Sequence, residues 1–388
     1  MVVPVQALVS KRKRVVSLRV LLTGGGTGGH IYPALAMARE LERRSRDHEM
    51  CYIGTEEGLE ADIVPKAGIP FECVNVQGFR RQLSWDNVRT VKKFVQATRR
   101  SKRLIQSFAP DVVIGTGGYV CGPVVYAAHK LGIPTLIHEQ NVIPGLTNKF
   151  LARYADVVAV SFEGSEQYFK RAACLVHTGN PRASEVAAAS KVNGRTSLGI
   201  AKDDTKPIVL VVGGSRGARP INEAVVHMAP RILEQDAFYV VYVTGNVHYE
   251  DVSRQLGDVS SRQLIVKPYI YNMPEVLAAS SLVVNRAGAS TLAEITALGL
   301  PSILIPSPYV TNNHQEANAR WLEKQGAARV ILERELSADT LWREIREVME
   351  HQSRREAMRQ AAAKLGQPQA AGRIVEELDK LVNKRGVH

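Results

Sequence analysis

Two segments of the chain place several glycines directly after a short apolar run. The first is Thr23–His30, which follows Leu18–Leu22, and the second is Gly213–Arg219, which follows Ile208–Val212. A strand that passes through such a turn into a helix exposes backbone N–H groups at the positive end of the helix, which suits a phosphate or pyrophosphate. Two such segments, nearly half the chain apart, predict two similar halves and a nucleotide-using enzyme with its chemistry between them.

His30 is the residue of the first segment that is best suited to chemistry. It lies where the loop becomes a helix, with Pro33 in the first turn, a position that proline favours. Beside a site of phosphate size, its imidazole is well placed to act as a general base. Helix capping or simple packing would also explain a histidine there, so the residues alone leave its role open.

The glycine spacing also matches the fingerprint of dinucleotide-binding proteins, through Gly24, Gly26 and Gly29. The match is weak, because turns in many α/β domains are rich in glycine for steric reasons. A dinucleotide site also needs an acidic residue at the end of the second strand, where only Glu56 and Glu57 are available. A P-loop is excluded, because no Lys-Ser or Lys-Thr pair follows the glycines.

Further segments place small or polar residues after an apolar strand. They are Asp111–Pro123, His138–Gly145 and Arg286–Glu294, and a polar cluster at Asn312–Asn318 follows a later strand. The carboxyl edge of a parallel sheet is where α/β enzymes hold their ligands, so we expect these segments to contribute to one site. Glu294 lies about one turn into a helix, where its carboxylate could accept hydrogen bonds from a ribose diol or stabilise the helix dipole.

Alternating strands and helices must position these residues. Short β-rich runs alternate with longer amphipathic stretches, which is typical of parallel α/β sheets, and 388 residues favour two domains. The predicted strands are Arg19–Leu22, Met50–Ile53, Phe71–Val74, Val112–Ile114, Thr135–His138, Val157–Ala159, Ile208–Val212, Tyr239–Val243, Leu264–Val266, Leu282–Asn285 and Ser302–Ile305. The predicted helices are Ile31–Arg44, Trp85–Phe108, Gly122–Leu131, Ala289–Leu298 and Ala370–Val382, and residues 182–206 predict a hinge with one short helix.

The composition narrows the class of partner. A net charge of +12 favours an anionic partner, and the low aromatic content of 6% favours phosphorylated substrates or an acidic membrane over nucleic acid. The four cysteines form no C-x-x-C pair, which favours reduced thiols over disulfides or a zinc site.

No apolar run approaches the roughly 20 residues that span a bilayer. We expect residues 1–17 to be a disordered basic extension, because their apolar part precedes Lys11–Arg14, the reverse of a secretory signal.

Residues 80–103 carry nine Lys or Arg residues and a single acidic one, Asp86. Apolar residues recur here at helical spacing, which is common for a helix packed on a core. Leu83 and Trp85 lie beside two arginines and resemble an interfacial anchor, and each basic residue near an anionic leaflet adds about 1 kcal/mol. We therefore expect peripheral contact with an anionic membrane.

Taken together, these segments resemble the MurG family, the bacterial N-acetylglucosaminyltransferases that convert lipid I to lipid II in peptidoglycan synthesis. The resemblance extends from about Leu18 to beyond residue 375, so that the first 17 residues lie outside it. It is carried by Gly25–His30, Gly115–Tyr119, His138–Asn141, Gly179–Arg182, Gly213–Arg219, Arg286–Glu294 and Gln315–Asn318.

The resemblance implies a GT-B fold, in which two Rossmann-like, doubly wound domains face an interdomain cleft. The implied parts are an acceptor and membrane-side domain at residues 18–181, a UDP-sugar-binding domain at 182–368, and a last helix within 369–388 that crosses back to the first domain. The implied donor is UDP-N-acetylglucosamine, and the acceptor is undecaprenyl-pyrophosphoryl-N-acetylmuramyl-pentapeptide. The resemblance further implies no cofactor and a peripheral location on the cytoplasmic face of the cell membrane, with other cell-wall synthesis proteins as further candidate partners.

Carried over by position, the resemblance also implies the site residues. The donor site would be lined by Thr27, Gly28, Gly29, Asn141, Arg182, Ser215, Ile270, Ala289, Ser290, Thr291, Leu292, Ala293, Glu294 and Gln315. Ile270 would bind uracil through its main chain, Glu294 the ribose and Gln315 the sugar. The acceptor pyrophosphate would lie against Gly26, Gly117, Gly118 and Tyr119.

The expected chemistry is a direct, inverting displacement by the acceptor 4-hydroxyl, with His30 as the favoured base and Glu139 as a supporting candidate. The negative charge on the leaving UDP would be stabilised by Ser215, by loop N–H groups and by a helix N-terminus. No essential metal is expected, because Asp203 and Asp204 lie in a linker without further ligands. The alternatives are a glycosyltransferase that acts on diacylglycerol, a dinucleotide-dependent oxidoreductase, and a non-catalytic UDP-sugar-binding protein.

Overall fold

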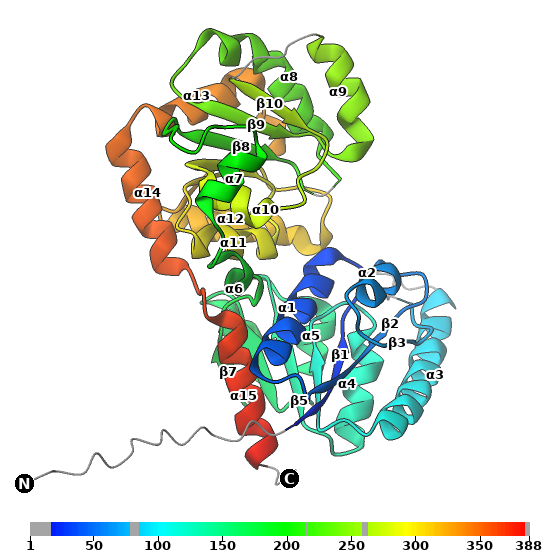
Figure 1. Cartoon of the computed structure of the whole chain (residues 1–388). Helices are drawn as coiled ribbons and strands as arrows, with labels where there is room; N and C mark the ends of the chain where they lie inside the picture. Colours follow the sequence, from blue (N-terminus) through cyan, green and yellow to red (C-terminus); the bar gives the residue numbers. More distant parts are fainter. Residues whose placement is uncertain (1–16, 78–84, 215, 258–262, 385–388) are drawn as a thin grey trace, which may run out of the picture.

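The chain forms two parallel β-sheets, each covered by helices on both faces (Figure 1). The computed structural model describes residues 17–77, 85–214, 216–257 and 263–384. The N-terminal domain is built on a seven-stranded sheet of order β3-β2-β1-β4-β5-β6-β7, and the C-terminal domain on a six-stranded sheet of order β10-β9-β8-β11-β12-β13. In both sheets the strand order reverses next to the first strand, between β1 and β4 and between β8 and β11. Such a reversal is where doubly wound folds bind their ligands.

The bounds of the elements follow the alternation of apolar and amphipathic runs. The strands are β1 Arg19–Thr23, β2 Glu49–Gly54, β3 Phe71–Cys73, β4 Val112–Gly115, β5 Thr135–Glu139, β6 Val157–Val160, β7 Leu175–His177, β8 Ile208–Val212, β9 Tyr239–Val243, β10 Leu264–Lys267, β11 Leu282–Asn285, β12 Ser302–Leu304 and β13 Ala328–Val330. The helices are α1 Gly28–Arg44, α2 Glu60–Lys66, α3 Trp85–Phe108, α4 Cys121–Lys130, α5 Leu146–Leu151, α6 Arg182–Val186, α7 Lys191–Ser197, α8 Arg219–Glu234, α9 Tyr249–Leu256, α10 Met273–Ala279, α11 Ala289–Ala297, α12 His314–Lys324, α13 Ala338–Met349, α14 Gln352–Leu365 and α15 Ala370–Lys384.

The central strands are buried on both faces, as expected for a parallel sheet between two helical layers. In β1, Val20 and Leu22 pack with α1 and α15 on one face of the sheet. The intervening Leu21 belongs to the cluster on the other face, with Ile53 of β2 and Val124 of α4. This alternation fixes the register of β1 and therefore places the turn after Thr23 at the carboxyl edge of the sheet.

The chain crosses between the domains twice, once near α6 and again between α14 and α15 (Figure 1). Helix α15 returns from the C-terminal domain and buries Ile374, Leu378 and Val382 in the cluster beneath α1. Arg44 at the end of α1 donates to the carbonyl of Gly372 at 2.8 Å, which ties the returning segment to the N-terminal domain. The last helix therefore contributes to the core of the first domain.

The strands and helices predicted from the sequence are confirmed, with ends that differ by at most three residues. Two strands were not predicted, β7 and β13, which are three residues long and lie at sheet edges. The prediction of one short helix in residues 182–206 is wrong, because both α6 and α7 form there. The predicted basic extension and the anchor residue Leu83 lie outside the described residues, apart from residue 17.

Candidate active site between the two sheets

The first two glycine-rich turns of the N-terminal domain pack directly against each other. One follows β1 and the other follows β4, the two strands at which the sheet order reverses. The N–H of Gly25 donates to the carbonyl of Gly117 at 3.2 Å. A Cβ atom on Gly118, whose φ is +82°, would lie 2.3 Å from the carbonyl oxygen of Gly25. Glycine is required here by the contact between the turns, whether or not a phosphate binds.

A buried carboxylate supports the first turn from below. Glu60 accepts hydrogen bonds from the N–H of Thr55 at 3.1 Å and its hydroxyl at 2.6 Å, and from the N–H of Gly26 at 3.1 Å. The N–H groups of Gly28 and Gly29, which begin α1, have no partner within the described part of the chain. The N–H groups of this turn that are available to a ligand are therefore those at the start of α1, because the N–H of Gly26 is already bonded to Glu60. Glu60 was not identified from the sequence, although it closely follows the end of β2.

His30 lies over the second glycine turn and is held in one tautomer. Its Nδ1–H donates to the carbonyl of Gly25 at 2.9 Å, and a carbonyl can only accept, so Nδ1 carries the proton. The other ring nitrogen, Nε2, lies against Gly117 and has no hydrogen-bond partner among the described residues. Burial is the main cause that lowers the pKa of His30 below 6.5, and the bond to Gly25 opposes this shift. His30 therefore presents a neutral, unprotonated Nε2 at the edge of the sheet.

Glu139 lies at the end of β5 and is only 2% exposed. Its carboxylate accepts four hydrogen bonds, from the N–H and Nδ2 of Asn141 at 2.9 and 3.1 Å, the N–H of Gly145 at 3.1 Å and Nδ2 of Asn148 at 2.9 Å. This network folds the loop after β5 around one buried charge. The side chain of Asn141 is thereby oriented by Glu139.

In the C-terminal domain, the start of α11 offers unpaired donors. The N–H groups of Ala289, Ser290 and Thr291 have no partner within the described ranges, because the residue before the helix is Gly288, which has no side chain to cap them. The hydroxyl of Ser290 is buried and has no hydrogen-bond partner among the residues that the structure describes. Unpaired donors at the positive end of a helix suit an anion.

The other residues of the C-terminal domain that were predicted to bind the sugar nucleotide lie near the carboxyl edge of the second sheet, where α11 also begins. Glu294, which is 7% exposed, pairs with Arg182 of α6, whose Nε lies 2.9 Å from its carboxylate. Burial raises the pKa of the Glu294 carboxyl, and the Arg182 guanidinium opposes this shift. Ile270 is buried in the core beneath β8 and β9, and Gln315 accepts a hydrogen bond from the N–H of Ser307 at 3.0 Å. Ser215 lies outside the described residues.

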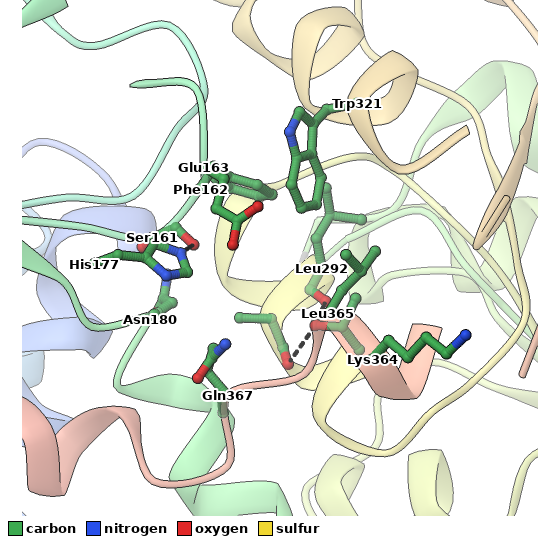
Figure 2. A pocket seen from close by; sticks show the side chains of 14 residues that line it. Ser161, Phe162, Glu163, His177, Asn180, Leu292, Trp321, Lys364, Leu365 and Gln367 are labelled. Atoms are coloured by element: carbon green, nitrogen blue, oxygen red, sulfur yellow. Dashed lines mark hydrogen bonds between the residues drawn. The ribbon is translucent and has the colours of Figure 1, made fainter. Parts of the chain in front are cut away.

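The two domains meet at an aromatic contact beside a small cavity (Figure 2). Phe162 of the N-terminal domain, from the loop after β6, is buried among residues of the C-terminal core and packs edge-on against Trp321 of α12, with ring centroids 5.0 Å apart. The adjoining cavity of about 50 Å³ is lined from both domains and both crossings, including His177, Asn180, Leu292 and Gln367. Ligand sites are usually several hundred Å³, so this cavity belongs to the hinge and is too small for a sugar nucleotide.

No group of three or more His, Cys, Asp or Glu side chains is placed to hold a metal ion in the described part of the chain. None of the helices described combines the length and the apolar content that crossing a bilayer requires.

Comparison with known proteins places this geometry in a family. Residues 20–160 match the glycosyltransferase family 28 N-terminal domain, and residues 208–374 match the glycosyltransferase family 28 C-terminal domain. A Bacillus cereus protein is 54% identical over 370 residues, which cover 95% of this chain and all of that protein; it is named UDP-N-acetylglucosamine–N-acetylmuramyl-(pentapeptide) pyrophosphoryl-undecaprenol N-acetylglucosamine transferase 1. The chain belongs to the MurG family. A similarly named protein from Halalkalibacterium halodurans is 55% identical over 358 residues, or 92% of this chain and 98% of its own length.

Solved structures agree with this assignment. The crystal structure of Acinetobacter baumannii MurG superimposes with a TM-score of 0.73 at 29% identity and covers 94% of this chain and 99% of its own. The calicheamicin glycosyltransferase CalG4, at 16% identity and a TM-score of 0.67, covers 95% and 98% and shares the fold. The predicted GT-B fold of two Rossmann-like domains and the predicted family are both confirmed.

Proposed function

We propose that this chain transfers N-acetylglucosamine from UDP-N-acetylglucosamine to the 4-hydroxyl of N-acetylmuramyl-pentapeptide pyrophosphoryl-undecaprenol, which converts lipid I to lipid II. The observation that carries the proposal is the 54% identity to a transferase named for this donor and acceptor. The match covers 95% of this chain and all of that protein. The reaction is an inverting displacement that forms a β-1,4 linkage and releases UDP. The chain is therefore a hexosyltransferase of peptidoglycan synthesis.

His30 acts as the general base in this proposal. Its Nε2 is unprotonated and unpartnered among the described residues, and it lies between the two glycine turns. The bond from Nδ1 to Gly25 stabilises the ring in the tautomer that accepts a proton at Nε2. The acceptor hydroxyl would lose its proton to Nε2 as its oxygen attacks the anomeric carbon, with the acceptor pyrophosphate against Gly118 and Tyr119.

Glu139 has a positioning role in this mechanism. Its two carboxylate oxygens each accept two hydrogen bonds, so they are occupied by donors of the protein and not directed at a substrate. Its charge also favours the protonated form of His30, which stabilises the base after proton transfer. Of the two sequence candidates, His30 is therefore the base and Glu139 organises the loop that carries Asn141.

The donor lies on the C-terminal domain in this proposal. The unpaired N–H groups at the start of α11 and the orphaned hydroxyl of Ser290 would bind the diphosphate and stabilise the charge of the leaving group. Glu294 would bind the ribose, held in place by Arg182. Ile270 would bind uracil through its main chain, and Gln315 the sugar hydroxyls.

We also infer peripheral contact with an anionic membrane on the cytoplasmic side. Support comes from exposed apolar residues on two neighbouring helices, Val91 and Val95 of α3 and Leu146 and Phe150 of α5. The helices touch through Phe94 and Phe150, whose ring centroids lie 6.2 Å apart. An apolar patch beside the basic residues of α3 has the composition of an interfacial surface.

The test is transfer of radiolabelled N-acetylglucosamine from its UDP derivative to a lipid I analogue, followed by chromatography of the product. Diacylglycerol serves as the competing acceptor in parallel reactions. We expect a labelled disaccharide product on the lipid I analogue and none on diacylglycerol. Absence of the disaccharide product, or transfer to diacylglycerol alone, would overturn the proposal.

A further inference from the structure

Asn318 is a fully buried polar residue in the second turn of α12, at the junction of the two domains. Its Oδ1 accepts a hydrogen bond from the N–H of Val142 at 3.0 Å, across the domain boundary. Its Nδ2 donates to Oδ1 of Asn141 and to the carbonyl of Ala287, each at 3.2 Å. The side chain therefore joins the loop after β5 in the N-terminal domain to the turn that opens α11 in the C-terminal domain.

These partners fix the orientation of two amides. Because Val142 offers a donor and Ala287 an acceptor, the oxygen and nitrogen of Asn318 cannot be exchanged. Asn141 is held in the same way, since its Nδ2 faces the carboxylate of Glu139 and its Oδ1 faces Asn318. A chain of hydrogen bonds thus runs from the buried carboxylate of Glu139 in one domain to the turn before α11, the helix of the proposed donor site, in the other.

The contact between Phe162 and Trp321 also joins the domains, but it differs in kind. It is apolar packing beside the hinge cavity, with ring centroids 5.0 Å apart, and it takes no part in the hydrogen bonds of Asn318 (Figure 2). Apolar packing stabilises the interface without direction, whereas hydrogen bonds specify register and orientation. The two contacts lie on the same helix, so they can be separated by substitution.

We propose that Asn318 is a positioning residue for the transfer reaction, which orients the amide of Asn141 and sets the register between the β5 loop and the start of α11. This inference rests on the proposed function. Asn318 acts through Asn141 and the domain alignment, without itself contacting the reacting atoms. Loss of the Asn318 side chain would therefore disturb the alignment of the donor sugar with the acceptor. It would not disturb binding of UDP, which in this proposal depends on the C-terminal domain.

The test uses the full chain and measures kcat and KM for UDP-N-acetylglucosamine, with the dissociation constant of UDP as a separate readout. Asn318→Ala is expected to lower kcat by about 100-fold, the typical cost of misplacing reacting groups by about 1 Å, and to leave UDP affinity unchanged. Trp321→Phe is the matched control, which should lower the unfolding temperature and leave kcat close to the unsubstituted value. If Asn318→Ala fails to bind UDP, Asn318→Ser replaces it in the same measurements.

A double-mutant cycle with Asn141→Ala decides whether Asn318 acts through Asn141. We expect Asn318→Ala to lower kcat little further once Asn141 is an alanine, because the residue it orients is gone. Independent, multiplying losses would overturn the inference, as would an equal loss of kcat in Trp321→Phe or an unchanged kcat in Asn318→Ala. All these results require transfer by the unsubstituted chain, so failure of the proposed function is recognised separately by its inactivity.

Discussion

Acidification is expected to destabilise the N-terminal domain through the imidazole of His138, which is fully buried on β5. Its Nε2 donates to the carbonyl of Gly179 at 3.0 Å, and its Nδ1 lies 3.0 Å from the side-chain nitrogen of Gln140. That nitrogen also donates to the carbonyl of Thr116 at 2.8 Å, so it is the NH₂ group that faces the ring. A proton on Nδ1 would place two donors against each other, and the neutral ring is the only form that fits.

The size of the effect follows from the pKa difference between the folded and unfolded states. Burial lowers the pKa of His138 from 6.5 to about 4. Below pH 6.5 the unfolded chain binds a proton that the folded chain excludes, so stability is complete above pH 6.5 and falls as the pH decreases toward 4. At pH 5 this difference corresponds to a loss of about 2 kcal/mol.

The assay is urea unfolding at pH 7 and pH 5, followed by circular dichroism, for the unsubstituted chain and for His138→Gln. The variant is expected to be less stable at pH 7, but to lose about 2 kcal/mol less than the unsubstituted chain between the two pH values. His227→Gln, which changes an exposed histidine on α8, serves as the control and should not alter the pH dependence. Equal losses in the unsubstituted chain and in His138→Gln would refute the reasoning.

Four further outcomes are expected. His30→Ala should lower turnover by about 10²–10⁴-fold with UDP affinity retained, and the acidic limb of the pH–rate profile should lie below 6.5, because burial lowers the pKa of His30. Arg182→Ala should destabilise the chain by about 3 kcal/mol in urea unfolding at pH 7, since it leaves the buried Glu294 carboxylate unpaired; a loss under about 1 kcal/mol would contradict this. Leu146→Glu should weaken sedimentation with anionic vesicles, whereas Val247→Glu, at an exposed site in the C-terminal domain, should not. Transfer should persist in a chelator, and strict dependence on added magnesium or manganese would disprove the metal-free mechanism.

The sequence was sufficient for the elements whose pattern is strong. β1 and β8 could be identified because three and five consecutive apolar residues, respectively, precede a glycine turn, which marks a strand buried on both faces. β7 and β13 were not predicted, although β3 and β12, which also have three residues, were. They form through pairing with neighbours distant in sequence, such as Val160 with His177. For these two strands, pairing with the neighbouring strand and not local pattern decides the structure.

The residues of the candidate site were likewise predicted only in part from the sequence. Glycine content located the turns correctly, yet it could not distinguish glycines that approach a phosphate from those that approach another turn. Gly118 belongs to the second kind, since a Cβ there would meet the carbonyl oxygen of Gly25, whereas a Cβ on Gly25 would meet the carboxylate of Glu60. Glu60 and Asn318 were not assigned roles, because their partners Gly26 and Val142 are 34 and 176 residues away in the chain. Residue type gives the chemistry that is available, and only the fold decides which atoms remain unused.

That criterion separates the ionisable groups at the edge of the first sheet. Glu60 and Glu139 each have their oxygens engaged by backbone and side-chain donors, so their charges are used to hold loops in place. Both ring nitrogens of His138 have hydrogen-bond partners, the carbonyl of Gly179 near the hinge and the side-chain NH₂ of Gln140. His30 differs, because one ring nitrogen is bonded and the other has no partner among the described residues. A group can exchange a proton with a substrate only through an atom that the fold leaves free, and at this edge that atom is Nε2 of His30.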